Sequence, residues 1–218
     1  MRTLAAALVV LLAAVIPQVS SALILSFENI SANNVNDAAI GESQLTVEVT
    51  GKDNQAFFKF MNAGPLASSI TDVYFDDGTL LGIAALEDSG GGVAFSKLAS
   101  PGELPSANYA TPPFVTTAGF SADSDPPAQP NGVNPGEWLQ VTFNLLSGQD
   151  FDDVLSALAL GGADGGLRIG IHVQGFASGG SEAFVNDGGT PLPEPNMLLV
   201  MGSGLAMLGG VAWRHWKH

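Results

Sequence analysis

The chain has 218 residues, no cysteine, 27 glycines, 13 prolines and a formal net charge of −14. This length suits one domain with appendages, and the lack of cysteine excludes disulfides and thiolate catalysis. The acidic balance argues against nucleic acid as a partner, because binding its backbone needs clustered Lys and Arg side chains.

The N-terminus has the pattern of a secretory signal peptide. Arg2 precedes an uncharged apolar run over 4–16, and the small residues Ser20 and Ala22 follow it. A short basic start, an apolar stretch of about a dozen residues and small residues at its end are typical of a segment that is removed after export. We expect residues 1–22 to be a signal peptide for the Sec translocon, with cleavage after Ala22.

Residues 23–189 are expected to form one exported domain. It holds four basic and 20 acidic residues, a net charge of −16. Apolar and polar residues alternate in several stretches, and a period of two indicates half-buried antiparallel strands. Asp76 to Thr79 is expected to be a hairpin turn. The predicted strands cover 23–29, 45–49, 56–61, 70–75, 80–84, 93–96, 139–145 and 167–174.

One helix is predicted after Asp150, whose side chain can cap it, and Gly161 can end it. Residues 99–135 are rich in proline and polar side chains and are expected to form long loops. Many short strands with turn signals favour a mainly β fold. The fold class that we expect is an antiparallel β-sandwich with one short helix.

Acidic side chains in the loops are candidate calcium ligands. Asp123 and Asp125 stand in the proline-rich segment. Calcium prefers six to eight oxygen ligands, which loops often supply. Turn and cap chemistry explains such residues equally well, so calcium is an open possibility and no other cofactor is expected.

Three other residues are candidate ligand contacts. Trp138 could stack on a sugar ring or pack beneath another element. Arg168 and His172 share one strand face with Gln174, and this face could contact a ligand or simply be solvated. The sequence contains no nucleophile elbow, zinc-helix motif or phosphate loop. We therefore expect no enzymatic activity, although a carboxylate pair beside Trp138 would suit a glycoside hydrolase.

The C-terminus combines three signals over residues 190–218. Pro193, Glu194 and Pro195 form a stiff, extended strip because each proline fixes its own φ and restricts the residue before it. Residues 197–213 are uncharged and long enough to cross a bilayer once. The basic end at 214–218 is expected on the cytoplasmic side, so the domain faces outward.

This tail resembles the PEP-CTERM sorting signal, which is also called the ice-binding protein C-terminal domain. The resemblance implies recognition by exosortase, a membrane transpeptidase of Gram-negative bacteria that make exopolysaccharide. It also implies a transient anchor in the inner membrane, cleavage near Pro193–Pro195, and delivery to the cell surface or extracellular matrix. We thus expect a structural or associative role in an exopolysaccharide or biofilm layer. A calcium-dependent carbohydrate-binding module and a secreted glycoside hydrolase are the alternatives.

Overall fold

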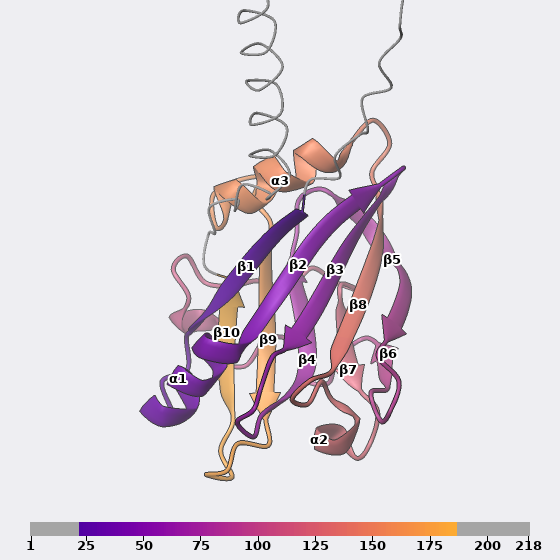
Figure 1. Ribbon diagram of the computed structural model, residues 1–218. Helices are drawn as coiled ribbons and strands as arrows, with labels where there is room; N and C mark the ends of the chain where they lie inside the picture. Colours follow the sequence, from indigo (N-terminus) through magenta and orange to yellow (C-terminus); the bar gives the residue numbers. More distant parts are fainter. Residues whose placement is uncertain (1–21, 187–218) are drawn as a thin grey trace, which may run out of the picture.

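The computed structural model describes residues 22–186, which form ten strands in one antiparallel sheet (Figure 1). The order across the sheet is β5-β8-β3-β2-β1-β10-β9-β4-β7-β6. The strand bounds are β1 Ala22–Asn29, β2 Leu45–Lys52, β3 Gln55–Asn62, β4 Ser69–Asp76, β5 Leu80–Asp88, β6 Phe95–Lys97, β7 Ser121–Ser124, β8 Trp138–Leu145, β9 Arg168–Gln174 and β10 Glu182–Asn186.

The sheet curls until it is nearly closed into a barrel. Strand β1 joins its two halves, since Ser26 still pairs with Thr46 of β2 whereas Phe27 pairs with Asn186 of β10. At the opposite side the edge strands approach, and Lys97 Nζ of β6 donates to the Ile83 carbonyl of β5 at 2.6 Å. The mainly β, antiparallel prediction is confirmed. The expected sandwich of two sheets is instead one continuous sheet, because a single strand serves both halves.

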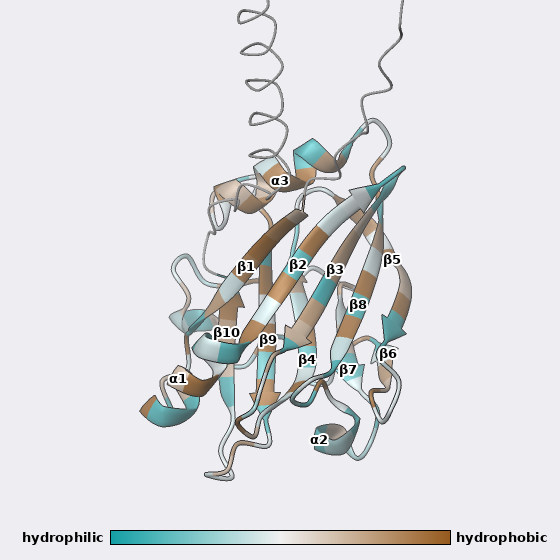
Figure 2. Cartoon of the chain, in the orientation of Figure 1, coloured by the Kyte–Doolittle hydropathy of each residue, from teal (hydrophilic) through white to brown (hydrophobic). Residues whose placement is uncertain are grey.

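The inner faces of the strands supply the core. Alternating apolar residues of each strand point inward, and Figure 2 shows them as brown bands between pale or teal ones along β2, β3 and β8. Three rings pack edge to face at the centre: Phe75 lies 5.2 Å from Phe58 and 4.7 Å from Phe143, centroid to centroid. Such pairs add to the stabilisation that area burial gives.

The predicted helix is present as α3, Phe151–Leu160, and Asp150 caps it by accepting from the backbone N–H of Asp152 and Asp153. The expectation of a single helix was wrong, because α1, Val35–Gln44, and the short α2, Ala128–Asn131, are also present. The polar sequence of α1 shows no apolar stripe, so its signal was weak. No helix within 22–186 is long and apolar enough to cross a membrane, and the span expected at 197–213 lies outside these residues.

The hairpin expected at Asp76 to Thr79 was also wrong. Strand β4 pairs with β7 and β9, whereas β5 pairs with β8, so this connection crosses from one half of the sheet to the other. Its conformation is local in origin: the Asp77 carboxylate accepts from the backbone N–H of Thr79 at 2.7 Å and of Leu80 at 2.9 Å. Such a turn sets the direction of the chain after β4, but it does not determine which strand β5 pairs with.

Residues 98–117, here called the covering segment, lie over the outer face of β4, β9 and β10. They include a short 3₁₀ helix, η1, Ala107–Tyr109. Leu104 and Phe114 form a second apolar cluster with Tyr74 on that face. The proline-rich segment is thus mostly irregular, as predicted, and it hides one outer face of the barrel from solvent.

Candidate functional site

The polar face predicted on one strand lies beneath the covering segment. Arg168 and His172 point outward from β9, while Ile169 and Ile171 between them belong to the core. Arg168 is 7% exposed and His172 is partly buried. The face is therefore not an open, solvated strand surface, because the covering segment shields it.

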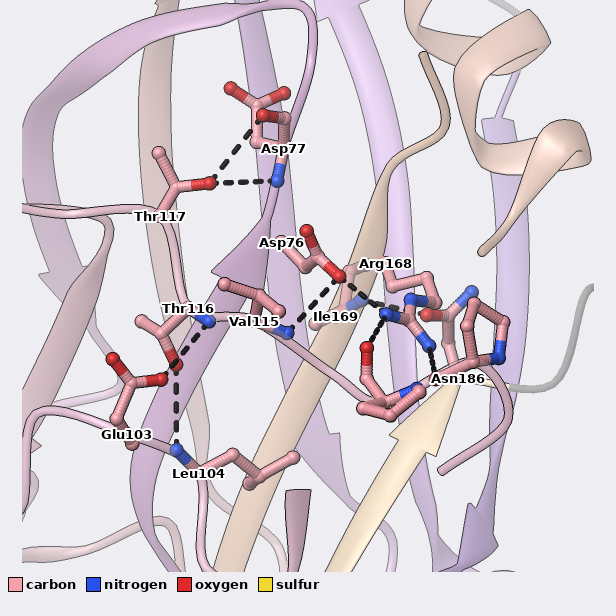
Figure 3. A network of polar contacts seen from close by, with 12 residues as sticks. Asp76, Asp77, Glu103, Leu104, Val115, Thr116, Thr117, Arg168, Ile169 and Asn186 are labelled. Carbon is pink, nitrogen blue, oxygen red and sulfur yellow. Dashed lines mark hydrogen bonds and ion pairs between the residues drawn. The ribbon is translucent and has the colours of Figure 1, made fainter. Parts of the chain in front are cut away.

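At one end of this face Arg168 binds both the sheet and the covering segment (Figure 3). Its Nη2 lies 2.5 Å from the Asp76 carboxylate and donates to the Pro113 carbonyl at 2.8 Å. Its Nη1 donates to the Pro112 carbonyl at 2.6 Å, and the guanidinium lies 5.2 Å from the Phe114 ring centroid. A charge this buried needs such partners, so Arg168 pins the covering segment to β4.

The other end of the face carries a His–Asp–Asp row across three strands. His172 Nδ1 lies 2.9 Å from Asp72 Oδ2, and Asp72 stands opposite Asp123 of β7 in the register. Burial, together with the charge and hydrogen bonding of Asp72, raises the pKa of Asp123 to about 6. Asp123 also accepts from the Ser100 backbone N–H at 3.3 Å. A carboxyl group beside a like charge holds its proton more tightly, so Asp123 is the group whose charge is disfavoured here.

Tyr74 lies between the two ends. Its hydroxyl donates to the Pro101 carbonyl at 3.0 Å, and burial, followed by the charge of Asp72, raises the pKa of this phenol above its usual range. The phenol therefore stays neutral and serves as a hydrogen-bond donor that holds the covering segment.

The two candidate calcium ligands differ in their partners. Asp123 faces Asp72 and the covering segment, whereas Asp125 accepts from Ser96 Oγ at 2.7 Å. Within residues 22–186 no group of three or more His, Asp or Glu side chains gathers in a way that could hold a metal ion. Calcium binding stays a prediction that these contacts neither require nor support.

Trp138 is not near Arg168 or His172. It lies on β8, on the opposite wall of the barrel, where Lys59 Nζ stands 4.5 Å from its ring centroid. The structure therefore does not bring the three candidate ligand contacts into one site. The acidic pair on the polar face also differs from a glycosidase pair, whose carboxyl groups stand about 5–10 Å apart around a sugar, because Asp72 and Asp123 are directly opposite each other on neighbouring strands and Asp123 lies beneath the covering segment.

Asp37, Asp72 and Glu182 are buried acidic residues that the sequence did not indicate. Glu182 is 1% exposed, and its carboxylate accepts from the backbone N–H of Asn34 at 2.5 Å and of Asn33 at 3.2 Å, and from Asn29 Nδ2 at 3.0 Å. Ser31 Oγ also donates to it. The Glu182 carboxylate therefore holds the turn from β1 into α1. The Asn-rich stretch was the only local signal, and nothing in it points to a partner about 150 residues away.

No family model, curated protein or solved structure matches this chain. The expected sorting motif, Pro193, Glu194 and Pro195, lies outside the described residues. Ala22, the expected cleavage residue, is the first residue of β1.

Proposed function

We propose that this chain is an exported cell-surface or matrix protein that an exosortase processes at the Pro-Glu-Pro motif. Its barrel serves a structural or associative role in an exopolysaccharide or biofilm layer. The observation that carries the proposal is the order of signals along the chain: an apolar leader over 4–16, an acidic domain, Pro193–Pro195, an apolar span at 197–213 and a basic end.

Each signal has a physical role in this order. The leader opens export through the Sec translocon. The apolar span stops translocation as a transmembrane helix, and Arg214 and Lys217 hold its end in the cytoplasm. Glu194, flanked by prolines, keeps an extended strip outside the lipid, where a membrane peptidase can bind it.

The domain boundaries agree with two cleavages. All ten strands that the structure describes lie between Ala22 and Asn186. Loss of residues 1–22 and of the tail would spare nearly all of that sheet, including the core residues Leu23, Leu25 and Phe27 of β1. A released domain can thus keep its fold, and its strong negative charge favours solubility in the matrix.

The test is to express the full chain in a Gram-negative host with and without exosortase and to fractionate the cells. We expect the released protein to begin at Leu23 and to end near Pro193–Pro195 by mass spectrometry. Glu194→Ala should leave the tail uncut and the protein in the membrane. Asp164→Ala, which removes an exposed carboxylate of the barrel, should be released normally. Normal release of the Glu194→Ala protein would refute motif-directed processing.

A further inference from the structure

The first half of β1 has a described strand on one side only. From Leu23 to Ser26 it pairs with β2. The neighbour on the other side is β10, but within residues 22–186 its ladder with β1 reaches only to the pair Asn186–Phe27 (Figure 1). An open edge of this kind presents backbone N–H and C=O groups with which a further strand can pair.

The hydrogen-bond phase of the β1–β10 ladder shows which backbone groups point to this open side. The Ile30 N–H donates to the Ala183 carbonyl at 2.9 Å, and the register places these two residues directly opposite each other. In an antiparallel sheet, successive residues of a strand direct their backbone groups alternately to its two neighbours. Ser26 and Ile24 precede Ile30 by an even number of residues, so their N–H and C=O groups face the open side.

The chain that continues from Asn186 is placed to fill this edge. The same register would set 187 opposite 26, 188 opposite 25, 189 opposite 24 and 190 opposite 23. The register between β10 and β9 runs only as far as Val185, and the Ile169 N–H is bonded to the Asn186 side chain at 2.7 Å instead. A continuation of β10 therefore keeps β1, and not β9, as its neighbour.

The sequence of this continuation suits the two faces of the edge. Alternation along β10 puts Phe184 in the main core and Val185 in the outer cluster. With this alternation Asp187 falls on the outer face, where its charge can stay in water, and Gly188 falls on the inner face, where it brings no polar side chain into the core. Pro191 has no N–H, so it ends the stretch that can donate to β1.

We propose that residues 187–190 add to the open edge of β1 as a continuation of β10. At about 3.4 Å per residue, the added strand covers roughly 14 Å of this edge. Pro193 then follows almost at once, at the same end of the barrel as the N-terminus of β1, because the two strands are antiparallel. The pairing thus gives the sorting motif a fixed place on the barrel. This consequence rests on the proposed function, whereas the pairing itself does not.

The added strand also shortens the tether between the barrel and the proposed membrane span at 197–213. Residues 191–196 remain as the tether, with a reach of roughly 20 Å at about 3.4 Å per residue, against roughly 34 Å for residues 187–196. Until the tail is cut, the barrel is therefore held with this end nearest the membrane.

Introduced cysteine pairs test the register, because the chain has no cysteine of its own. The test uses the exported chain in detergent, expressed without exosortase so that it keeps its tail. Ile24→Cys with Gly189→Cys places both side chains on the outer face, with Cα atoms about 5.5 Å apart, which suits a disulfide. Ile24→Cys with Gly188→Cys is the matched control, because a shift of one residue turns the second side chain to the other face. Under mild oxidation the first pair should close within one chain at least tenfold faster.

Hydrogen exchange distinguishes a paired strand from a chance approach of the tail. The Ile24 and Ser26 amides should be protected in the unchanged chain. Gly189→Pro removes an N–H that faces β1, so exchange at Ile24 should become at least tenfold faster. Gly188→Pro removes an N–H that faces away from β1, and it should leave Ile24 protected.

Three results would overturn the proposal: equal closure of the two cysteine pairs, rapid exchange at Ile24 and Ser26 in the unchanged chain, or disulfides that form only between chains, which would assign the edge to a second copy. These measurements do not depend on exosortase. Failure of Glu194→Ala to block release would therefore refute the proposed sorting and leave the strand pairing standing.

Discussion

Leu104 lies directly over Gly170 in the middle of β9. A Cβ at Gly170 would stand 2.7 Å from Leu104 Cδ2, which is closer than packed atoms allow, and 3.2 Å from Phe114 Cζ, which is a tight contact. Gly170 therefore leaves the space into which the covering segment packs. On either side of it, Arg168 donates to the Pro112 carbonyl of the same segment, whereas His172 contacts Asp72 of β4.

We expect Gly170→Ala to loosen the covering segment. The added methyl group displaces Leu104, and overpacking of this kind costs about 1–3 kcal/mol in the free energy of unfolding. Chemical denaturation measures the loss, and protease cleavage within 98–117 should become faster. Gly82→Ala on β5 is the matched control, since a Cβ there has no neighbour within 4 Å. Equal stability of both variants would contradict a close contact between Gly170 and Leu104.

Glu182→Gln is expected to destabilise the barrel. The carboxylate accepts from donors at Asn29, Asn33 and Asn34, whereas the amide would present an N–H₂ group to some of them. Hydrogen bonds to a charged group contribute about 1.5–3 kcal/mol each, so a loss of that order in the free energy of unfolding is expected. Hydrogen exchange should show the change first at α1.

The control is Glu87→Gln, because Glu87 is an exposed residue of β5 whose carboxylate accepts from Gln140 Nε2 at 3.3 Å. Its stability should stay within about 0.5 kcal/mol of the wild type, as is usual for surface substitutions. If the Glu182→Gln protein unfolds at the same denaturant concentration as this control, the hydrogen bonds of Glu182 make no net contribution to the free energy of unfolding.

What could be predicted from sequence was local. Alternation along 139–145 and 167–174 predicted β8 and β9, and the Asp150 cap predicted α3, because each signal sits within the element that it describes. Strand partners depend on contacts between residues that are distant in sequence. The pairing of β1 with both halves of the sheet, and the absence of a hairpin after Asp76, therefore could not be predicted from local patterns. The burial of Arg168 was missed for the same reason: the segment that covers it lies about 55 residues earlier in the chain.

The Asp72–Asp123 pair predicts how stability depends on pH. Burial and the neighbouring Asp72 raise the pKa of Asp123 to about 6, from 3.8 for an ordinary aspartate. The folded chain thus holds this proton more tightly than the unfolded chain. The stabilisation is fully present below pH 3.8 and is lost as the pH rises through 6. His172, Tyr74 and Asp125 are the other titratable groups near the pair.

Asp123→Asn should remove this dependence. The amide is neutral at every pH and keeps an oxygen that can accept from Ser100, so the variant should gain stability relative to the wild type between pH 4 and 7. The melting temperatures of both proteins across this pH range measure the difference in their stability. The contributions of the other carboxyl groups are the same in both proteins and cancel in this difference. Asp164→Asn, which changes an exposed residue, should follow the wild-type profile. Parallel profiles for Asp123→Asn and the wild type would mean that the pKa of Asp123 is the same in the folded and unfolded chains, which would contradict the raised pKa.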